Sequence, residues 1–75
     1  MSKLPVISGV QIIKALLKQG YYIRGQEGSH VHLRHPTKPA TTIPNHPEIS
    51  RGTLKEIIKQ LGLSRDEFLQ LLGYN

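Results

Sequence analysis

The residues of this chain best suited to acid–base chemistry are His30 and His32, which follow the pair Gly28-Ser29. An imidazole ordinarily has a pKa of about 6.5, so an exposed one can accept or donate a proton at neutral pH. RNA carries its own nucleophile, the 2′-hydroxyl group, and its cleavage needs a base, a proton donor for the leaving 5′-oxygen and positive charge beside the phosphate. His30 is therefore a candidate acid–base residue for the cleavage of RNA.

Two other interpretations of the histidines stay open. His30 and His32 can ligate zinc if His35 or His46 supplies a third nitrogen, although no acidic residue or cysteine accompanies them in the run. Alternatively, the four histidines are ordinary polar residues of strands and loops. We expect neither a metal site nor a cofactor.

The charge balance indicates a polyanionic partner. Ten Lys and Arg residues against five Asp and Glu residues give a net charge of +5, and RNA, DNA and an acidic protein all fit this charge. Tyr22, Arg24 and Arg34 can stack on nucleotides or pair with them. Lys55 and Lys59, four residues apart on a predicted helix, can follow a phosphate backbone. Alternatively, Tyr22 only packs against its neighbours, and Lys55 and Lys59 only lie on a solvated helix face.

Hydrophobic spacing predicts a first helix over residues 9–19. Ser8 is its expected N-cap, with Gln11 three residues on as in a capping box, and Gly20 marks its expected end. The predicted apolar stripe consists of Val10, Ile12, Ile13, Leu16 and Leu17. The backbone amides at the Ser8-Gly9 start are also a weak candidate for holding a phosphate.

Alternation of polar and apolar residues predicts three strands, over residues 21–26, 29–35 and 40–44. A tight turn at Glu27-Gly28 is expected to join the first two strands into a hairpin.

The same alternation predicts which side chains face solvent. Val31 and Leu33 point inward with Tyr21 and Ile23. The expected outward residues are His30, His32 and Arg34, beside Tyr22, Arg24 and Gln26.

Two further helices are predicted over residues 51–61 and 65–72, the second opening with a capping box from Ser64 to Glu67. The order α-β-β-β-α-α predicts an α+β fold in which helices cover one face of a three-stranded antiparallel sheet. The other face of the sheet is then left to solvent.

Size and composition predict one domain over residues 1–75, monomeric when free. The chain has no cysteine, which excludes disulfides and thiolate catalysis and favours the cytoplasm. No apolar run approaches the roughly 18 residues of a membrane span, and the first residues lack the apolar stretch of an export signal.

A series of short motifs extends from Leu4 to Phe68. The motifs are Leu4-Pro5, Ser8-Gly9, Leu17 to Tyr21, Gly28-Ser29-His30, Thr42-Ile43-Pro44, His46 and the run from Gly52 to Ser64. Each motif is weak alone, but their order and spacing are specific. In that order the chain resembles the HicA, or YcfA-like, family of toxins from toxin–antitoxin pairs.

This resemblance implies a fold like that of double-stranded-RNA-binding domains. It also implies a metal-independent ribonuclease that cleaves messenger RNA, arrests growth and is silenced by a HicB-like antitoxin. The histidine of the family's Gly-Ser-His motif, which is catalytic, corresponds to His30. Relatives often have another residue at the position of His32, so the resemblance implies no role for His32.

The sequence thus predicts His30 as the catalytic residue. The predicted RNA-binding residues are Tyr22, Arg24, Ser29, His32, Arg34, Lys55 and Lys59. Two alternatives remain: a non-catalytic module of the same fold that grips RNA by its phosphates and 2′-hydroxyl groups, and a small adaptor for an acidic protein. The sequence does not identify the proton donor.

Overall fold

The computed structural model describes residues 4–74; the ends of the predicted domain, residues 1–3 and 75, lie outside the described residues. Its elements are α1 (Gly9–Lys18), β1 (Tyr22–Glu27), β2 (His30–Arg34), β3 (Thr41–Pro44), α2 (Arg51–Leu61) and α3 (Arg65–Leu71). The predicted α+β fold and element order are confirmed, and each element ends within a residue of its predicted limits.

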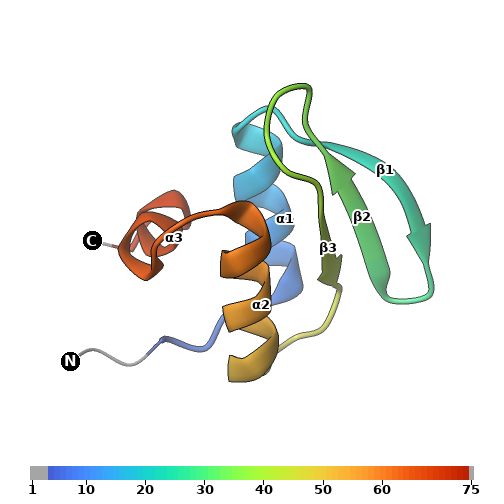
Figure 1. The fold of residues 1–75 in the computed structure, drawn as a ribbon. Helices are drawn as coiled ribbons and strands as arrows, with labels where there is room; N and C mark the ends of the chain where they lie inside the picture. Colours follow the sequence, from blue (N-terminus) through green and yellow to red (C-terminus); the bar gives the residue numbers. More distant parts are fainter. Residues whose placement is uncertain (1–3, 75) are drawn as a thin grey trace.

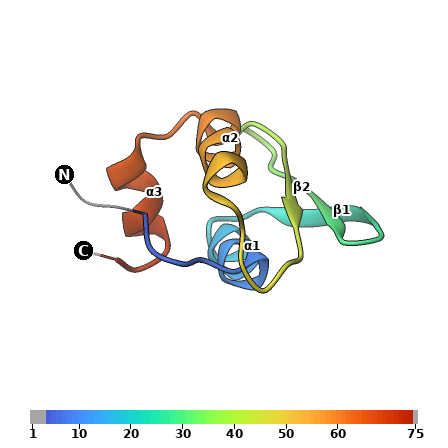
Figure 2. The same ribbon diagram turned by 90° about the horizontal axis from the view of Figure 1, so that it is seen from below.

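The elements form three layers. β2 lies between β1 and β3, and both pairs of strands are antiparallel. α1 and α2 pack against β3 on one face of the sheet (Figure 1). Figure 2 shows α3 on the far side of these two helices from the sheet. In the described part of the chain, one face of the sheet therefore carries no helix, as the element pattern predicted.

Local sequence sets the ends of the helices. Ser8 Oγ accepts from the Gln11 amide while Gln11 Oε1 accepts from the Ser8 amide, so the predicted capping box of α1 is confirmed. Ser64 and Glu67 make the same pair of bonds at α3. Gly20, after α1, has φ of 95°, a left-handed conformation that favours glycine.

The buried face of α1 differs from the predicted stripe. Ile12 and Leu16 are buried, but Val10 and Leu17 remain 44% and 42% exposed. Gly9 explains the difference, because a Cβ at that position would collide with the backbone that follows β3. Gly9, Ile12 and Leu16 share one helix face by their spacing of three and four residues, and this face is turned inward.

A β-bulge in β1 interrupts the predicted alternation. The register shifts between Ile23 and Gly25, so Arg24 is the extra residue of the bulge. Beyond it, Gln26 lies opposite the buried Val31 and so belongs to the helix-covered face. Gln26 therefore lies on the other face of the sheet from the one predicted, although it is exposed as predicted.

The β1–β2 hairpin extends beyond the helices (Figure 1). Ile23 lies opposite the buried Leu33 and so faces the same side of the sheet, as predicted, but it is itself 50% exposed. The reason is that β1 is an edge strand and that no helix among the described residues lies across it. The turn lies at Gly28-Ser29, one residue later than predicted, and Gly28 has φ of 57°.

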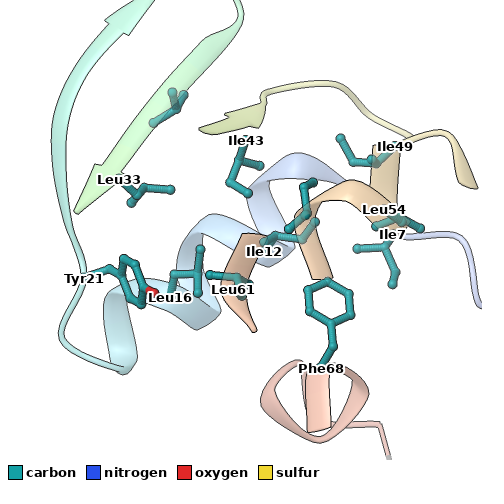
Figure 3. Close-up of a cluster of buried hydrophobic side chains, with 12 residues drawn as sticks. Ile7, Ile12, Leu16, Tyr21, Leu33, Ile43, Ile49, Leu54, Leu61 and Phe68 are labelled. Atoms are coloured by element: carbon teal, nitrogen blue, oxygen red, sulfur yellow. The ribbon is translucent and has the colours of Figure 1, made fainter. Parts of the chain in front are cut away.

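Phe68 joins α3 to the rest of the molecule. Its side chain is completely buried and points from α3 toward the other helices (Figure 3). The buried cluster around it consists of Ile7, Ile12, Leu16, Tyr21, Val31, Leu33, Ile43, Ile49, Leu54, Ile57 and Leu61. Phe68 is thus the fully buried side chain of α3, and the partly buried Leu69 and Leu71 add to its packing against the cluster.

We expect Phe68→Ala to lower the free energy of unfolding by about 3–5 kcal/mol, the usual cost of deleting a buried aromatic ring. A chain of this size has a total stability of about 4–11 kcal/mol, so the loss would be a large share of it. Urea unfolding followed by circular dichroism measures the change. Val6→Ala, at a residue that is 68% exposed, is the matched control and should change stability by less than about 0.5 kcal/mol. Equal losses in the two variants would contradict the central role of Phe68.

Candidate functional site

His30 is the first residue of β2 and directly follows the hairpin turn. Its backbone lies between Glu27 of β1 and Pro44 of β3, so strands hold it on both sides. The side chain is exposed, and its ring forms no hydrogen bond with any residue in the described range 4–74. The fold therefore presents an imidazole on a backbone held by two strands, with neither ring nitrogen bonded to another described residue.

The outward orientation of β2 follows the predicted pattern. Val31 and Leu33 are buried, while His30 and Arg34 are exposed and His32 is partly exposed. Alternation in the strand places these three polar residues on the outer face of the sheet.

His30 lines a groove of about 390 Å³. The other lining residues are Thr42, Pro44, His46, Glu48, Ile49, Ser50 and Thr53. The Asn45 amide donates to the Ser29 carbonyl oxygen at 2.6 Å, and His46 Nε2 lies 3.2 Å from Ser29 Oγ. These bonds bring His46, sixteen residues along the chain, beside the turn that precedes His30.

The start of α1 holds this loop in place. The Gly9 amide donates to the His46 carbonyl oxygen at 2.9 Å. A Cβ on Gly9 would collide with the Pro44 carbonyl oxygen and lie 3.0 Å from Asn45 Cα. The Gly9 amide is thus engaged within the chain, and the Ser8-Gly9 start serves to position the loop rather than to present this amide to a phosphate.

His32 is held at both ring nitrogens. Nε2 lies 3.1 Å from Glu27 Oε1 and Nδ1 lies 2.9 Å from Thr42 Oγ1. An ionised carboxylate only accepts, so Nε2 carries the hydrogen, and the Thr42 hydroxyl donates to Nδ1 when the ring is neutral. Glu27 was not among the predicted site residues. It reaches the outer face because the bulge at Arg24 shifts the register, and residue alternation gives no signal for that shift.

His35 has a structural role at the opposite end of β2. Its Nε2 lies 3.0 Å from the Gln19 carbonyl oxygen, and its Nδ1 accepts from the Thr37 amide at 3.0 Å. Its ring lies 5.0 Å from the ring of Tyr21, whose hydroxyl donates to the Pro39 carbonyl oxygen. Burial raises the pKa of Tyr21. His35 therefore ties the end of α1 to the loop after β2.

The zinc alternative finds no third ligand in the structure. Within residues 4–74, no group of three or more His, Cys, Asp or Glu side chains is placed to hold a metal ion. His30 and His46 share the groove, whereas His32 and His35 are bonded elsewhere.

The cationic and aromatic candidates lie on two surfaces. Tyr22 lies opposite Arg34, and both are exposed. Arg24 and Arg34 line a second hollow of about 670 Å³, beside the His32 ring. Lys55 and Lys59 are exposed on α2 and line neither hollow. The structure thus groups the two arginines with His32, whereas His30 lies in the other groove, and the two lysines line neither.

These features define a small basic α+β domain with a histidine-containing groove at the edge of an open sheet face. Residues 9–63 match the family described as HicA toxin of bacterial toxin–antitoxin. The match covers more than half of the chain, and the chain therefore belongs to the HicA toxin family. A comparison of the chain with curated proteins found no match. Within residues 4–74, none of the helices has the length and apolar character needed to cross a membrane.

Proposed function

We propose that this chain is a cytoplasmic ribonuclease toxin that cleaves messenger RNA without a metal ion and is neutralised by a HicB-like antitoxin. One observation carries the proposal: the ring of His30, unbonded within residues 4–74, lines a groove on a strand that is paired on both sides. Membership of the HicA toxin family supports the toxin role.

In this proposal His30 takes part in proton transfer while the RNA 2′-hydroxyl attacks the adjacent phosphorus. Arg24 and Arg34 supply positive charge near the phosphate, and Tyr22 offers a ring on which a base can stack. Lys55 and Lys59 contact phosphates farther along the strand.

Ser29 and His32 complete the proposed RNA-binding set, but their contacts within the protein limit what each can do. The Ser29 hydroxyl is bonded to His46, and the His32 ring is bonded on both sides. Each can reach RNA only by sharing or exchanging these bonds.

We expect the purified chain to cleave a defined RNA in the presence of EDTA, and His30→Ala to lose this activity. Removal of a general acid–base group typically costs about 10²–10⁴-fold in rate. The His30 ring makes no bond within residues 4–74, so its removal should leave the fold intact. Gel analysis of end-labelled RNA measures the rate, and circular dichroism checks the fold. Undiminished cleavage by the folded variant would contradict the assignment.

The same experiment tests the alternatives. A wild-type chain that binds RNA without cleaving it is a binding module, and one that does neither fits an adaptor. Both outcomes would overturn the proposed ribonuclease.

We expect Arg24→Ala/Arg34→Ala to weaken RNA binding more than Lys55→Ala/Lys59→Ala does, although each pair removes two charges. The arginines line the same hollow of the sheet as His32, whereas the lysines lie on α2. Loss of two phosphate contacts should reduce the slope of log K against log salt by about 1.4 for single-stranded RNA. Fluorescence anisotropy at several salt concentrations measures both quantities. A larger loss from the lysine pair would place the RNA path on α2 instead.

We expect the antitoxin to cover the outer sheet face with His30, Tyr22 and Arg34. A standard interface takes about 800 Å² from each partner, roughly one sixth of this chain's 4960 Å² surface. An acidic partner surface would suit this face and speed capture. Modification by diethylpyrocarbonate, mapped by mass spectrometry, should be blocked at His30 in the complex but unchanged at His35. Equal reactivity of His30 in the free and bound chain would move the interface away from this face.

A further inference from the structure

We infer that His46 is the second proton-transfer residue of the groove, and that it protonates the 5′-oxygen as that oxygen leaves. This inference rests on the proposed ribonuclease function. It assigns the group that the sequence left unidentified.

The placement of His46 provides the first argument. His30 comes from the start of β2 and His46 from the segment after β3, yet both side chains line the same groove. In an in-line displacement the attacking and leaving oxygens lie on opposite sides of the phosphorus. The base and the acid must therefore approach from different directions, which two separate segments allow.

The hydrogen bonding of the His46 ring provides the second argument. Nε2 lies 3.2 Å from Ser29 Oγ, whereas Nδ1 has no partner within residues 4–74. In a protonated ring, Nε2–H donates to the Ser29 hydroxyl and Nδ1–H remains free to donate. Ser29 thus orients the ring without occupying the proton that is to be transferred.

The other two histidines are less suited to this step. His32 shares the strand face of His30, but both of its nitrogens are engaged, with Glu27 and Thr42. His35 is bonded to Gln19 and Thr37 at the far end of β2. Within the described range, His46 is the histidine beside His30 that keeps a ring nitrogen free.

The backbone of His46 is also firmly held. Its carbonyl oxygen accepts from the Gly9 amide, and its amide donates to the Pro44 carbonyl oxygen at 2.9 Å. Proton transfer depends on placing the donor within hydrogen-bond reach of the acceptor, and these bonds limit how far the ring can move.

The reaction balances without another reactant. The 2′-oxygen forms a bond to phosphorus and gives its proton to His30, while the bond from phosphorus to the 5′-oxygen breaks and that oxygen takes a proton from His46. The products are a 2′,3′-cyclic phosphate and a free 5′-hydroxyl group. Transfer of one proton from His30 back to His46 through water restores the starting state.

A substrate with sulfur in place of the scissile 5′-oxygen tests the role of His46. A thiol has a pKa of about 8.5, so a thiolate can leave without being protonated, whereas an alkoxide needs a proton in order to leave. We expect His46→Ala to cleave ordinary RNA about 10²–10⁴-fold more slowly than the wild type and to cleave the 5′-thio RNA at close to the wild-type rate. His30→Ala should be slow on both substrates.

Asn45→Ala is the matched control, because Asn45 precedes His46 in the same loop and its side chain is exposed with no bond to residues 4–74. It should cleave both substrates at the wild-type rate. Circular dichroism confirms the fold of each variant, and the 5′-thio substrate detects an active site that is merely distorted, since distortion slows both reactions.

The outcomes separate this inference from the proposed function. If the wild type cleaves and His46→Ala keeps its full rate on ordinary RNA, or is equally slow on both substrates, the role of His46 is overturned while the ribonuclease stands. If the wild type itself does not cleave RNA, the proposed function fails, and this inference fails with it.

Discussion

The close approach of α1 to the segment after β3 is the constraint on which the groove depends. Only a residue without a Cβ fits at position 9, because the Pro44 carbonyl oxygen and the Asn45 backbone lie directly against it. The same contact turns the face that carries Ile12 and Leu16 toward the sheet and leaves Val10 partly exposed. The bond from the Gly9 amide to the His46 carbonyl oxygen then fixes the loop at the end of β3. One contact between a helix start and a strand end thus sets both the core packing and the position of His46.

The β1–β2 turn is joined to this framework through Ser29. Its carbonyl oxygen accepts from the Asn45 amide, and its hydroxyl lies within hydrogen-bond distance of His46 Nε2. The turn joins β1 and β2 in a hairpin that extends beyond the helices (Figure 1). These bonds tie the turn to the loop. The backbone is therefore held at Ser29, just before His30, as well as along β2. A catalytic group gains from such preorganisation, since little movement is needed to bring it to its substrate.

Local features of the sequence predicted the helices and strands, whereas long-range contacts determined which side of each one is buried. The capping box of Ser8 and Gln11 and the left-handed Gly20 depend on residues a few positions apart, and the helix limits followed from them. The buried face of α1 depends on a contact between Gly9 and residues near position 45, which helical spacing does not report. The bulge at Arg24 is equally hidden, and it alone reversed the predicted outward direction of Gln26.

The candidate site shows the same division between residue type and environment. His30 was predicted from its motif and lies exposed as expected, but composition does not distinguish it from the other three histidines. The structure separates them by what their nitrogens already do. His35 uses both nitrogens to hold backbone, and His32 uses both to hold Glu27 and Thr42. A ring committed in this way must break a bond before it can transfer a proton, and that cost slows catalysis. Within residues 4–74 the His30 ring makes no bond and the His46 ring keeps one nitrogen free, so the two rings that share the groove avoid this cost.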